Sequence, residues 1–447
     1  MSAATSNSTA GALSFFCTCP RGLEGALSEE LKELAARFTI NVHQSVPGGV
    51  HVSGNWITAF AINLHSRIAS RALLRIAHGR YTKESDIFDL VLQQRWENWF
   101  TARHTLRVDV TAIKSPLRSI EFITLKIKDA VCDRLRDKTG ARPSVDTQFP
   151  DVRVQGFLDA THATIYLDTS GEALFKRGWR KATGDAPLRE NLAAGLLRLA
   201  KWSPGQVLYD PFCGSGTIII EAAQSALGIA PGVNRKFGFE KLQGVPLTDW
   251  QTMKAVAVDQ LHQPQSADLG IYGSDISGDM LTMARENARD AHIQIALPFK
   301  QVDARFVKPP QALAEGQSGI MLSNPPYDER IALRGGTGGG AADAQHRGRR
   351  SAKDILADDD EVWGLKPEAI EAARAAESTE QPGFYAEFSS TLKGQFAGWQ
   401  VYLFTADLQV PKALRLKESM RTPLFNGAIE CRLFRFEMVK GGNRPAN

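Results

Sequence analysis

The sequence predicts an α/β protein whose C-terminal part is a mostly parallel sheet covered by helices. Three observations support this prediction. Apolar, strand-like runs alternate with segments of helical spacing along most of the chain. A Gly-rich turn stands between the strand-like run 206–209 and the helix-like run 218–227. The length of 447 residues predicts two to four domains, because a domain usually holds about 100 to 200 residues.

The composition is that of a soluble globular protein, with 43% hydrophobic and 23% charged residues. No apolar run reaches the roughly 18 to 20 residues that cross a bilayer, so we expect no membrane span. Residues 1–13 are rich in Ser, Thr and Ala and have no basic residue ahead of an apolar stretch. This pattern favours a disordered tail over a secretory signal.

The five cysteines form no C-x-x-C pair. Their scarcity favours a reducing cytoplasm and argues against both disulfides and a metal site. Within residues 61–142 there are 16 Lys or Arg against 9 Asp or Glu. This excess is compatible with a polyanionic partner, although a solvated charged face would give the same count.

The N-terminal part alternates strands and helices from the start. Gly48 and Gly49 mark a turn between two of these elements. Period-two alternation predicts strands, and apolar residues three to four apart predict helices. The expected strands are 14–19, 50–52, 106–113, 152–158 and 164–167, and the expected helices are 22–38, 56–76 and 119–136.

The C-terminal part begins near Pro187 with a helix over 188–199 and a strand over 206–209. After the helix 218–227, further apolar strands are expected at 269–273, 298–302, 319–322 and 401–405. Residues 334–383 interrupt the pattern with Gly-rich, basic and acidic runs. We expect this stretch to be a mobile insertion.

The Gly-rich turn, Asp210-Pro211-Phe212-Cys213-Gly214-Ser215-Gly216-Thr217, predicts a nucleoside-cofactor site. Glycines between a strand and a helix let backbone amides approach a ligand closely. No lysine follows for a nucleoside triphosphate loop, and Ile219 stands where a dinucleotide fingerprint has its third glycine. These departures leave a nucleoside cofactor without a pyrophosphate.

Two carboxylates follow the next strands, Asp275 after 269–273 and Asp303 after 298–302. A carboxylate accepts hydrogen bonds from ribose hydroxyls, as we expect for Asp275, or from the amine of an adenine, as we expect for Asp303. A single aspartate in such a place is more often a helix cap. Three loops of this kind in strand order favour the cofactor.

The segment Ser323-Asn324-Pro325-Pro326-Tyr327 follows another predicted strand. Its two prolines fix the backbone and remove two amide donors, which leaves the Asn324 amide oxygen and the Pro325 carbonyl as acceptors. Tyr327 adds an aromatic face. The arrangement suits a planar base whose exocyclic amine donates to both acceptors while the ring stacks on the tyrosine. For an isolated pair of prolines, a rigid turn would be the simpler interpretation.

Together with five further segments, these motifs resemble the bacterial THUMP-domain methyltransferases that modify guanine N2 in 23S ribosomal RNA. The further segments are FCTCPRGLE (16–24), RPSVD (142–146), KRGWR (176–180), APLRENL (186–192) and FNGAIECR (425–432). The resemblance implies a tail over 1–13, a ferredoxin-like domain over 14–65 and a THUMP domain over 66–175, with the last two binding RNA. It also implies a Rossmann-like class I methyltransferase domain over 176–440, with a mostly parallel seven-stranded sheet and the insertion 334–383.

The resemblance also implies roles for residues at the matching positions. The base-binding residues would be Asn324, Pro325, Pro326 and Tyr327, and the S-adenosyl-L-methionine site would comprise Asp210, Phe212, Gly214, Ser215, Gly216, Asp275, Asp303 and Asn191. Asp328 departs from the family, which usually has glycine there. Glu221, one helical turn beyond the Gly-rich turn, is not assigned to the ligand.

The predicted function is therefore methyl transfer from S-adenosyl-L-methionine to guanine N2 of 23S ribosomal RNA or its precursor, by a cytoplasmic monomer without a metal or a membrane contact. The motif itself leaves N6-adenine methylation of RNA or DNA open, and also methylation of a glutamine side chain. The basic N-terminal part favours structured RNA among these substrates. Carbon-5 methylation of cytosine is disfavoured, because no cysteine stands near Asn324. A non-catalytic RNA-binding factor in ribosome assembly is the alternative of another class.

Overall fold

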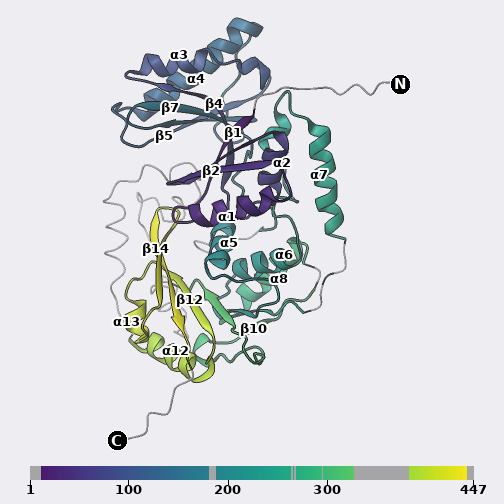
Figure 1. Cartoon of the computed structure of the whole chain (residues 1–447), viewed down its shortest axis with the longest axis vertical. Helices are drawn as coiled ribbons and strands as arrows, with labels where there is room; N and C mark the ends of the chain where they lie inside the picture. The colour runs from purple at the N-terminus through teal and green to yellow at the C-terminus, as the bar shows by residue number, and fades with distance from the viewer. Residues whose placement is uncertain are drawn as a thin grey trace, which may run out of the picture. The chain divides into compact units, whose positions relative to one another are not determined.

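The computed structural model describes residues 12–180, 188–262, 265, 268–293, 295–326 and 382–439. The chain forms two compact units (Figure 1). One unit holds the described residues up to Thr18 together with Leu27–Glu172 and Lys236–Lys254. The other holds Cys19–Ala26, Ala173–Arg235 and the described chain from Ala255 onward. Each unit contains one seven-stranded sheet.

The sheet of the first unit has the order β2-β3-β1-β4-β7-β6-β5. Its neighbouring strands are antiparallel except for β5 and β6, which are parallel. The strands are β1 (Leu13–Thr18), β2 (Ile40–Val46), β3 (Gly49–Gly54), β4 (Arg71–Arg80), β5 (Leu106–Ala112), β6 (Val152–Leu158) and β7 (His162–Asp168). The central strand β4 joins the first three strands of the chain to the last three, so a single sheet runs through the whole unit.

Local sequence explains where the helices of this unit begin and end. The side chain of Asn55 accepts from the backbone N–H of Thr58 at the start of α2. Ser119 caps α4 in the same way, and Gly140, with φ 78°, ends it. The helices are α1 (Glu24–Ala35, whose first turn belongs to the second unit), α2 (Trp56–His65), α3 (Glu84–Leu92), the short η1 (Trp96–Asn98) and α4 (Ile120–Thr139).

The prediction of one helix over 56–76 is wrong. Helix α2 ends at His65, and Ser66 already has an extended backbone with ψ 127°. Residues 71–80 form β4, a central strand whose first four residues are all buried. A strand buried on both faces shows no period-two pattern, so its apolar residues were read as a continuation of the helix. The strands expected at 14–19, 106–113, 152–158 and 164–167 are confirmed within one or two residues.

The sheet of the second unit has the order β10-β9-β8-β11-β12-β14-β13. Its first five strands are parallel, and β14 runs antiparallel to β12 and β13. The strands are β8 (Leu208–Asp210), β9 (Ile271–Asp275), β10 (Phe299–Gln301), β11 (Ile320–Ser323), β12 (Gln400–Thr405), β13 (Met420–Asn426) and β14 (Ile429–Glu437). The parallel strands predicted from sequence are thus confirmed, and their carboxyl ends meet at one edge of the sheet.

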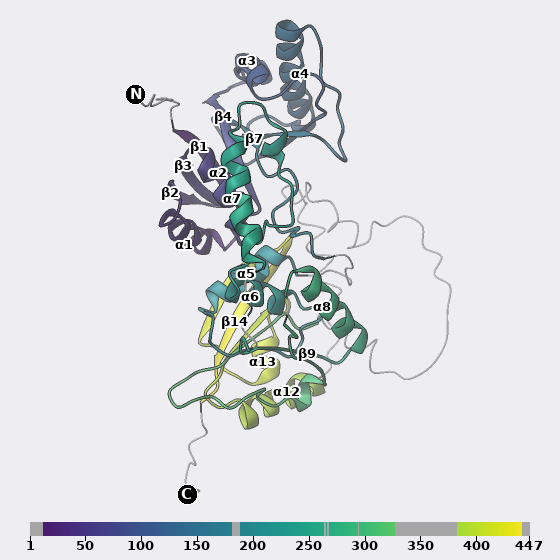
Figure 2. The ribbon, with the colours of Figure 1, turned by 90° about the vertical axis from the view of Figure 1, so that its right-hand side faces the viewer.

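Helices cover this second sheet, and Figure 2 shows α5, α6 and α8 beside its strands. They are α5 (Glu190–Leu199), α6 (Thr217–Ala226), α8 (Gly278–Asp290), α12 (Pro382–Gln395) and α13 (Val410–Leu414), with the short η3 (Ala304–Phe306). The short η2 (Gly238–Lys241) belongs to the first unit. Helix α7 (Leu247–Gln260) is divided between the units. Buried aromatic side chains, among them Phe388, Phe396 and Phe434, fill the core that includes α12 and β12. The expected insertion 334–383 lies outside the described residues except for its last two, which begin α12.

Candidate functional site

The Gly-rich turn joins β8 to α6 at the carboxyl edge of the second sheet. Gly214 has φ 53° and Gly216 has φ 85°, the left-handed region that residues with a side chain rarely adopt. A Cβ atom on Gly216 would lie 3.1 Å from the Cβ of Ala284 in α8. A Cβ atom on Gly214 would have only the Met280 Cε within 4 Å, at 3.6 Å. The turn therefore packs tightly on α8 at Gly216 and leaves room beside Gly214.

Asp275 connects this turn to the end of β9. The backbone N–H of Gly214 donates to Asp275 Oδ2 at 3.0 Å, and that of Ser277 donates to Oδ1 at 2.9 Å. The N–H of Cys213 also donates to the carbonyl of Ser274 at 2.9 Å. The structure thus brings together the Gly-rich turn and Asp275, as the sequence predicted.

Asp210 connects the same turn to the end of β11. Its Oδ1 accepts from the N–H of Phe212 at 3.0 Å and from the hydroxyl of Ser323 at 2.8 Å. The carboxyl group is buried, and this burial raises the pKa of Asp210 to about 7; the two hydrogen bonds act in the opposite direction, and the charge of Asp275 raises it further. Ser323 is a residue whose role the sequence did not indicate.

A change of Asp210 to Asn tests this buried carboxyl group. Because its pKa is higher in the folded chain than in the unfolded chain, its contribution to stability is full below about pH 4 and is lost as the pH rises to about 7. Asn keeps an oxygen that accepts both hydrogen bonds but does not titrate. We expect Asp210→Asn to gain stability relative to the wild type between pH 4 and pH 8, by up to roughly 4 kcal/mol.

Thermal and urea unfolding of the two proteins at several pH values measures this difference. Parallel stability curves for wild type and variant would show that Asp210 titrates normally in the folded protein.

Asn324 is the first residue after β11, which pairs with β8 in the sheet. Its Oδ1 atom is buried and has no hydrogen-bond donor within the described part of the chain. Leaving a buried acceptor without a donor costs about 1 to 3 kcal/mol. Pro325 beside it is buried and Pro326 is partly buried. The structure therefore presents an oxygen that suits an N–H donor of a ligand, while Tyr327 lies outside the described residues.

Asp303 also lies at this edge, directly after β10, but its carboxylate already has a partner. Arg305 Nη2 lies 2.7 Å from Asp303 Oδ2, and Arg305 also contacts Glu387 of α12 at 3.0 Å. The hydrogen bonds from Arg305 lower the pKa of Asp303, so it stays charged at neutral pH. Arg305 is a second residue that the sequence reasoning missed, although its spacing of two from Asp303 was a visible signal.

Buried ion pairs support the turn from the side of α5. Arg180 Nε lies 3.0 Å from Glu190 Oε1 at the start of α5, and its Nη2 donates to Thr217 Oγ1 at 2.7 Å at the start of α6. Arg177 Nε lies 3.1 Å from Glu221 Oε1, and both side chains are almost fully buried. Glu221 is thus a structural residue, in line with its exclusion from the ligand set. Asn191 is buried in the first turn of α5.

Three further observations concern the cysteines, possible metal ligands and membrane spans. All five cysteines are buried and none of them forms a disulfide bond. Burial raises the pKa of the Cys213 thiol well above its ordinary value, so it is not a thiolate at neutral pH. Among the described residues, no three His, Cys, Asp or Glu side chains are grouped as metal ligands would be. None of the described helices has the length and apolar character needed to cross a membrane.

Three family models match successive parts of the chain. Residues 14–73 match the RlmL ferredoxin-like domain, 81–168 the THUMP domain, and 177–336 the RMKL-like methyltransferase domain. Together with the two sheets, these matches confirm the predicted fold class: a ferredoxin-like domain and a THUMP domain precede a methyltransferase fold with a mostly parallel seven-stranded sheet.

Individual proteins are similar over nearly the whole chain. The "Ribosomal RNA large subunit methyltransferase K/L" of Psychromonas ingrahamii is 34% identical over 436 residues, which are 97% of this chain and 51% of that protein. The chain thus spans about half the length of the curated relatives it matches. A possible methylase from Clostridium difficile 630 has a similar structure, with a TM-score of 0.74 and 25% identity, over 98% of this chain and 100% of the other.

A further solved structure was determined with a ligand. It is SMU.472, a putative methyltransferase complexed with SAH, which is 25% identical with a TM-score of 0.71 over 96% of this chain and 99% of the other.

Proposed function

Because the chain belongs to the THUMP-domain methyltransferases that join an RlmL ferredoxin-like domain to an RMKL-like methyltransferase domain, we propose that it methylates the exocyclic N2 amine of a guanine in large-subunit ribosomal RNA. The observation that supports this most directly is the buried Asn324 Oδ1, which lacks a donor among the described residues. A planar base amine supplies such a donor. The name of the Psychromonas relative supports ribosomal RNA as the substrate.

The cofactor is S-adenosyl-L-methionine, which supplies an activated methyl group whose sulfur becomes neutral when the methyl leaves. The edge of the second sheet suits this molecule, because Gly214 leaves space beside the turn and the carboxylate of Asp275 lies next to it. We assign the cofactor to Asp210, Phe212, Gly214, Ser215, Gly216, Asp275, Asp303 and Asn191. Among these residues, Asp303 has the least capacity to accept a hydrogen bond from the cofactor, because its carboxylate already accepts hydrogen bonds from Arg305.

The residues of the Asn-Pro-Pro-Tyr segment position the amine. Asn324 Oδ1 and the Pro325 carbonyl accept hydrogen bonds from the two N–H groups of the amine. These hydrogen bonds favour a nitrogen whose lone pair is less delocalised into the ring and points toward the methyl donor. Pro326 fixes the backbone, and we assign Tyr327 to stacking on the base after it has left the RNA helix. Ser323 holds the segment in place through its hydrogen bond to Asp210. Orientation by these groups supplies most of the acceleration, because the sulfur leaves as a neutral group that needs no proton. The amine nitrogen loses one proton to solvent as its bond to the methyl carbon forms.

Labelled methyl transfer followed by nucleoside mass spectrometry tests the proposal. The substrates are 23S ribosomal RNA and large-subunit precursor particles from cells that lack the protein. We expect N2-methylguanosine as the labelled product. Labelled N6-methyladenosine would favour the adenine alternative, and label in a protein fraction would favour glutamine. A chain that binds RNA without any transfer would be an assembly factor.

We further propose that 14–65 and 66–175 bind the RNA, that 176–440 carries out the transfer, and that the protein acts as a cytoplasmic monomer. Light scattering of the purified protein should then give a mass near 48.9 kDa. A mass near twice that value would contradict the monomer.

A further inference from the structure

The sheet of the first unit has two chemically different faces. Phe15, Val52 and Leu74 lie opposite one another in neighbouring strands and are each 1% exposed. They form the face against which the helices pack, as the close approach of α4 to Gly156 of β6 also shows. Side chains alternate along a strand, so Ser14 and Arg75, the neighbours of Phe15 and Leu74, project from the opposite face.

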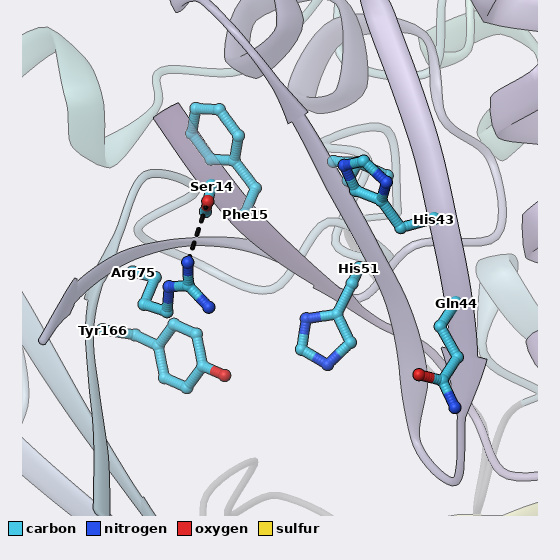
Figure 3. Close-up of a pocket in the computed structure, with 8 residues that line it drawn as sticks. Ser14, Phe15, His43, Gln44, His51, Arg75 and Tyr166 are labelled. Carbon is cyan, nitrogen blue, oxygen red and sulfur yellow. Dashed lines mark hydrogen bonds between the residues drawn. The ribbon is translucent and has the colours of Figure 1, made fainter. Parts of the chain in front are cut away.

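This opposite face carries a hollow of about 270 Å³. Figure 3 shows Arg75 and Tyr166 on one side of it and His51 and Gln44 on the other. Five strands contribute to the hollow through Ser14, His43, Gln44, His51, Arg75 and Tyr166. Phe15 and Val52, whose side chains belong to the helix-covered face, complete the lining. The ring of Phe16 adds an aromatic neighbour, with its centre 4.8 Å from that of His51 and 6.1 Å from that of Tyr166.

Two strand irregularities coincide with the hollow. In β2, the two residues His43 and Gln44 stand against the single residue His51 of β3, because Val42 pairs with Val52 and Ser45 with Val50. The pairing of β2 with β3 therefore shifts register, with a bulge at His43 and Gln44. The pairing of β4 with β7 also shifts, directly after Arg75. Bulges change the direction of side chains and are frequent at functional sites.

Arg75 gives the hollow a positive charge. Its lining includes Arg75, His43 and His51 but no carboxylate. Burial lowers the pKa of His51, and the positive charges of Arg75 and His43 lower it further, so His51 is neutral at neutral pH. Of the five N–H donors of Arg75, one binds Ser14 Oγ at 3.1 Å. The other donors have no acceptor among the described residues, so the guanidinium group is available to an anion.

We propose that this cluster binds a backbone phosphate of the RNA substrate, with Arg75 as the main contact and His43, Gln44 and Tyr166 as further donors. The inference rests on the proposed function in taking RNA as the polyanion. A guanidinium group matches the geometry of phosphate oxygens and keeps its charge at all physiological pH values. Phosphate contacts fix the orientation of a nucleic acid without reading its sequence. The cluster therefore positions the RNA rather than selecting the base.

Arg75→Gln in the full chain tests this inference by binding to an unmodified 23S ribosomal RNA transcript between 50 and 200 mM KCl. We expect the affinity at low salt to fall about five- to tenfold and the slope of log K against log[KCl] to decrease by about 1, because one phosphate contact releases about one counterion. Arg37→Gln is the matched control. Arg37 is exposed and lies two residues after the end of α1, so this variant removes the same charge from a position outside the cluster.

His43→Gln is a second variant, at an exposed position, for use if Arg75→Gln lowers the melting temperature of the protein. We expect His43→Gln also to weaken RNA binding. Arg75→Gln and His43→Gln that bind RNA like the Arg37→Gln control would overturn the inference. The inference would also be overturned by a variant that no longer binds inorganic phosphate, as measured by nuclear magnetic resonance, but binds RNA with unchanged affinity. Wild-type protein that shows the Arg75-dependent salt slope but methylates no RNA would contradict only the proposed function.

Discussion

Asn324→Ala is expected to reduce the rate of methyl transfer by about 100- to 1,000-fold or more, while the dissociation constant of S-adenosyl-L-methionine changes little. The loss is large because the variant removes the acceptor that orients the amine at the reacting centre, and such groups contribute on this scale. Cofactor affinity is retained because the buried Oδ1 of Asn324 has no donor within the described chain and so holds no part of the Gly-rich turn.

Single-turnover kinetics and isothermal titration with the cofactor measure the two quantities separately. Asn324→Asp is the informative partner variant, since it keeps an acceptor oxygen in the same place and should retain more activity than the alanine variant. An equal loss of cofactor affinity and of rate in Asn324→Ala would refute the assignment of Asn324 to the target base.

Glu221→Ala is expected to destabilise the methyltransferase unit by about 3 to 5 kcal/mol, because it removes the carboxylate from the buried guanidinium group of Arg177. The two side chains are 0% and 2% exposed, so water does not replace the lost partner. Glu221 lies in the second turn of α6, and the same variant should therefore also weaken cofactor binding by loosening the Gly-rich turn that precedes this helix.

Differential scanning fluorimetry of the full chain, with and without cofactor, measures both effects. Glu286→Ala is the matched control, because Glu286 is exposed on α8 of the same unit, and exposed substitutions usually change stability by less than about 0.5 kcal/mol. If Glu221→Ala melts at the same temperature as Glu286→Ala, the buried pair contributes nothing to stability.

The parts of the site that were predictable lie close together in the sequence. The Gly-rich turn and the Asn-Pro-Pro segment are each continuous, and their chemistry follows from residue types and spacing. The bond between Ser323 and Asp210 joins residues 113 positions apart, and the Arg177–Glu221 pair spans 44 positions. Such contacts depend on which strands become neighbours, and no local pattern specifies the placement of β8 beside β11.

The fold shows the same division. Helix α4 was predicted over 119–136 from the spacing of its residues, and the structure extends it to Thr139, directly before Gly140. Strand β4 was not predicted, because its first four residues are all buried and so do not show the alternation of apolar and polar residues that identifies a strand. The N–H donors of Arg75 that do not bind Ser14, and the two register shifts near this residue, are likewise properties of the folded sheet that no local sequence pattern indicates. Composition gave only the basic excess in this part of the chain.

The placement of β4 in the middle of the first sheet affects how this protein can be divided. The strand begins within the segment matched by the ferredoxin-like model and ends just before the segment matched by the THUMP model. It pairs with β1 on one side and β7 on the other. A recombinant fragment that begins after residue 80 would leave the whole edge of β7 unpaired and prone to aggregation. The two segments therefore share one continuous sheet, and we expect them to unfold together.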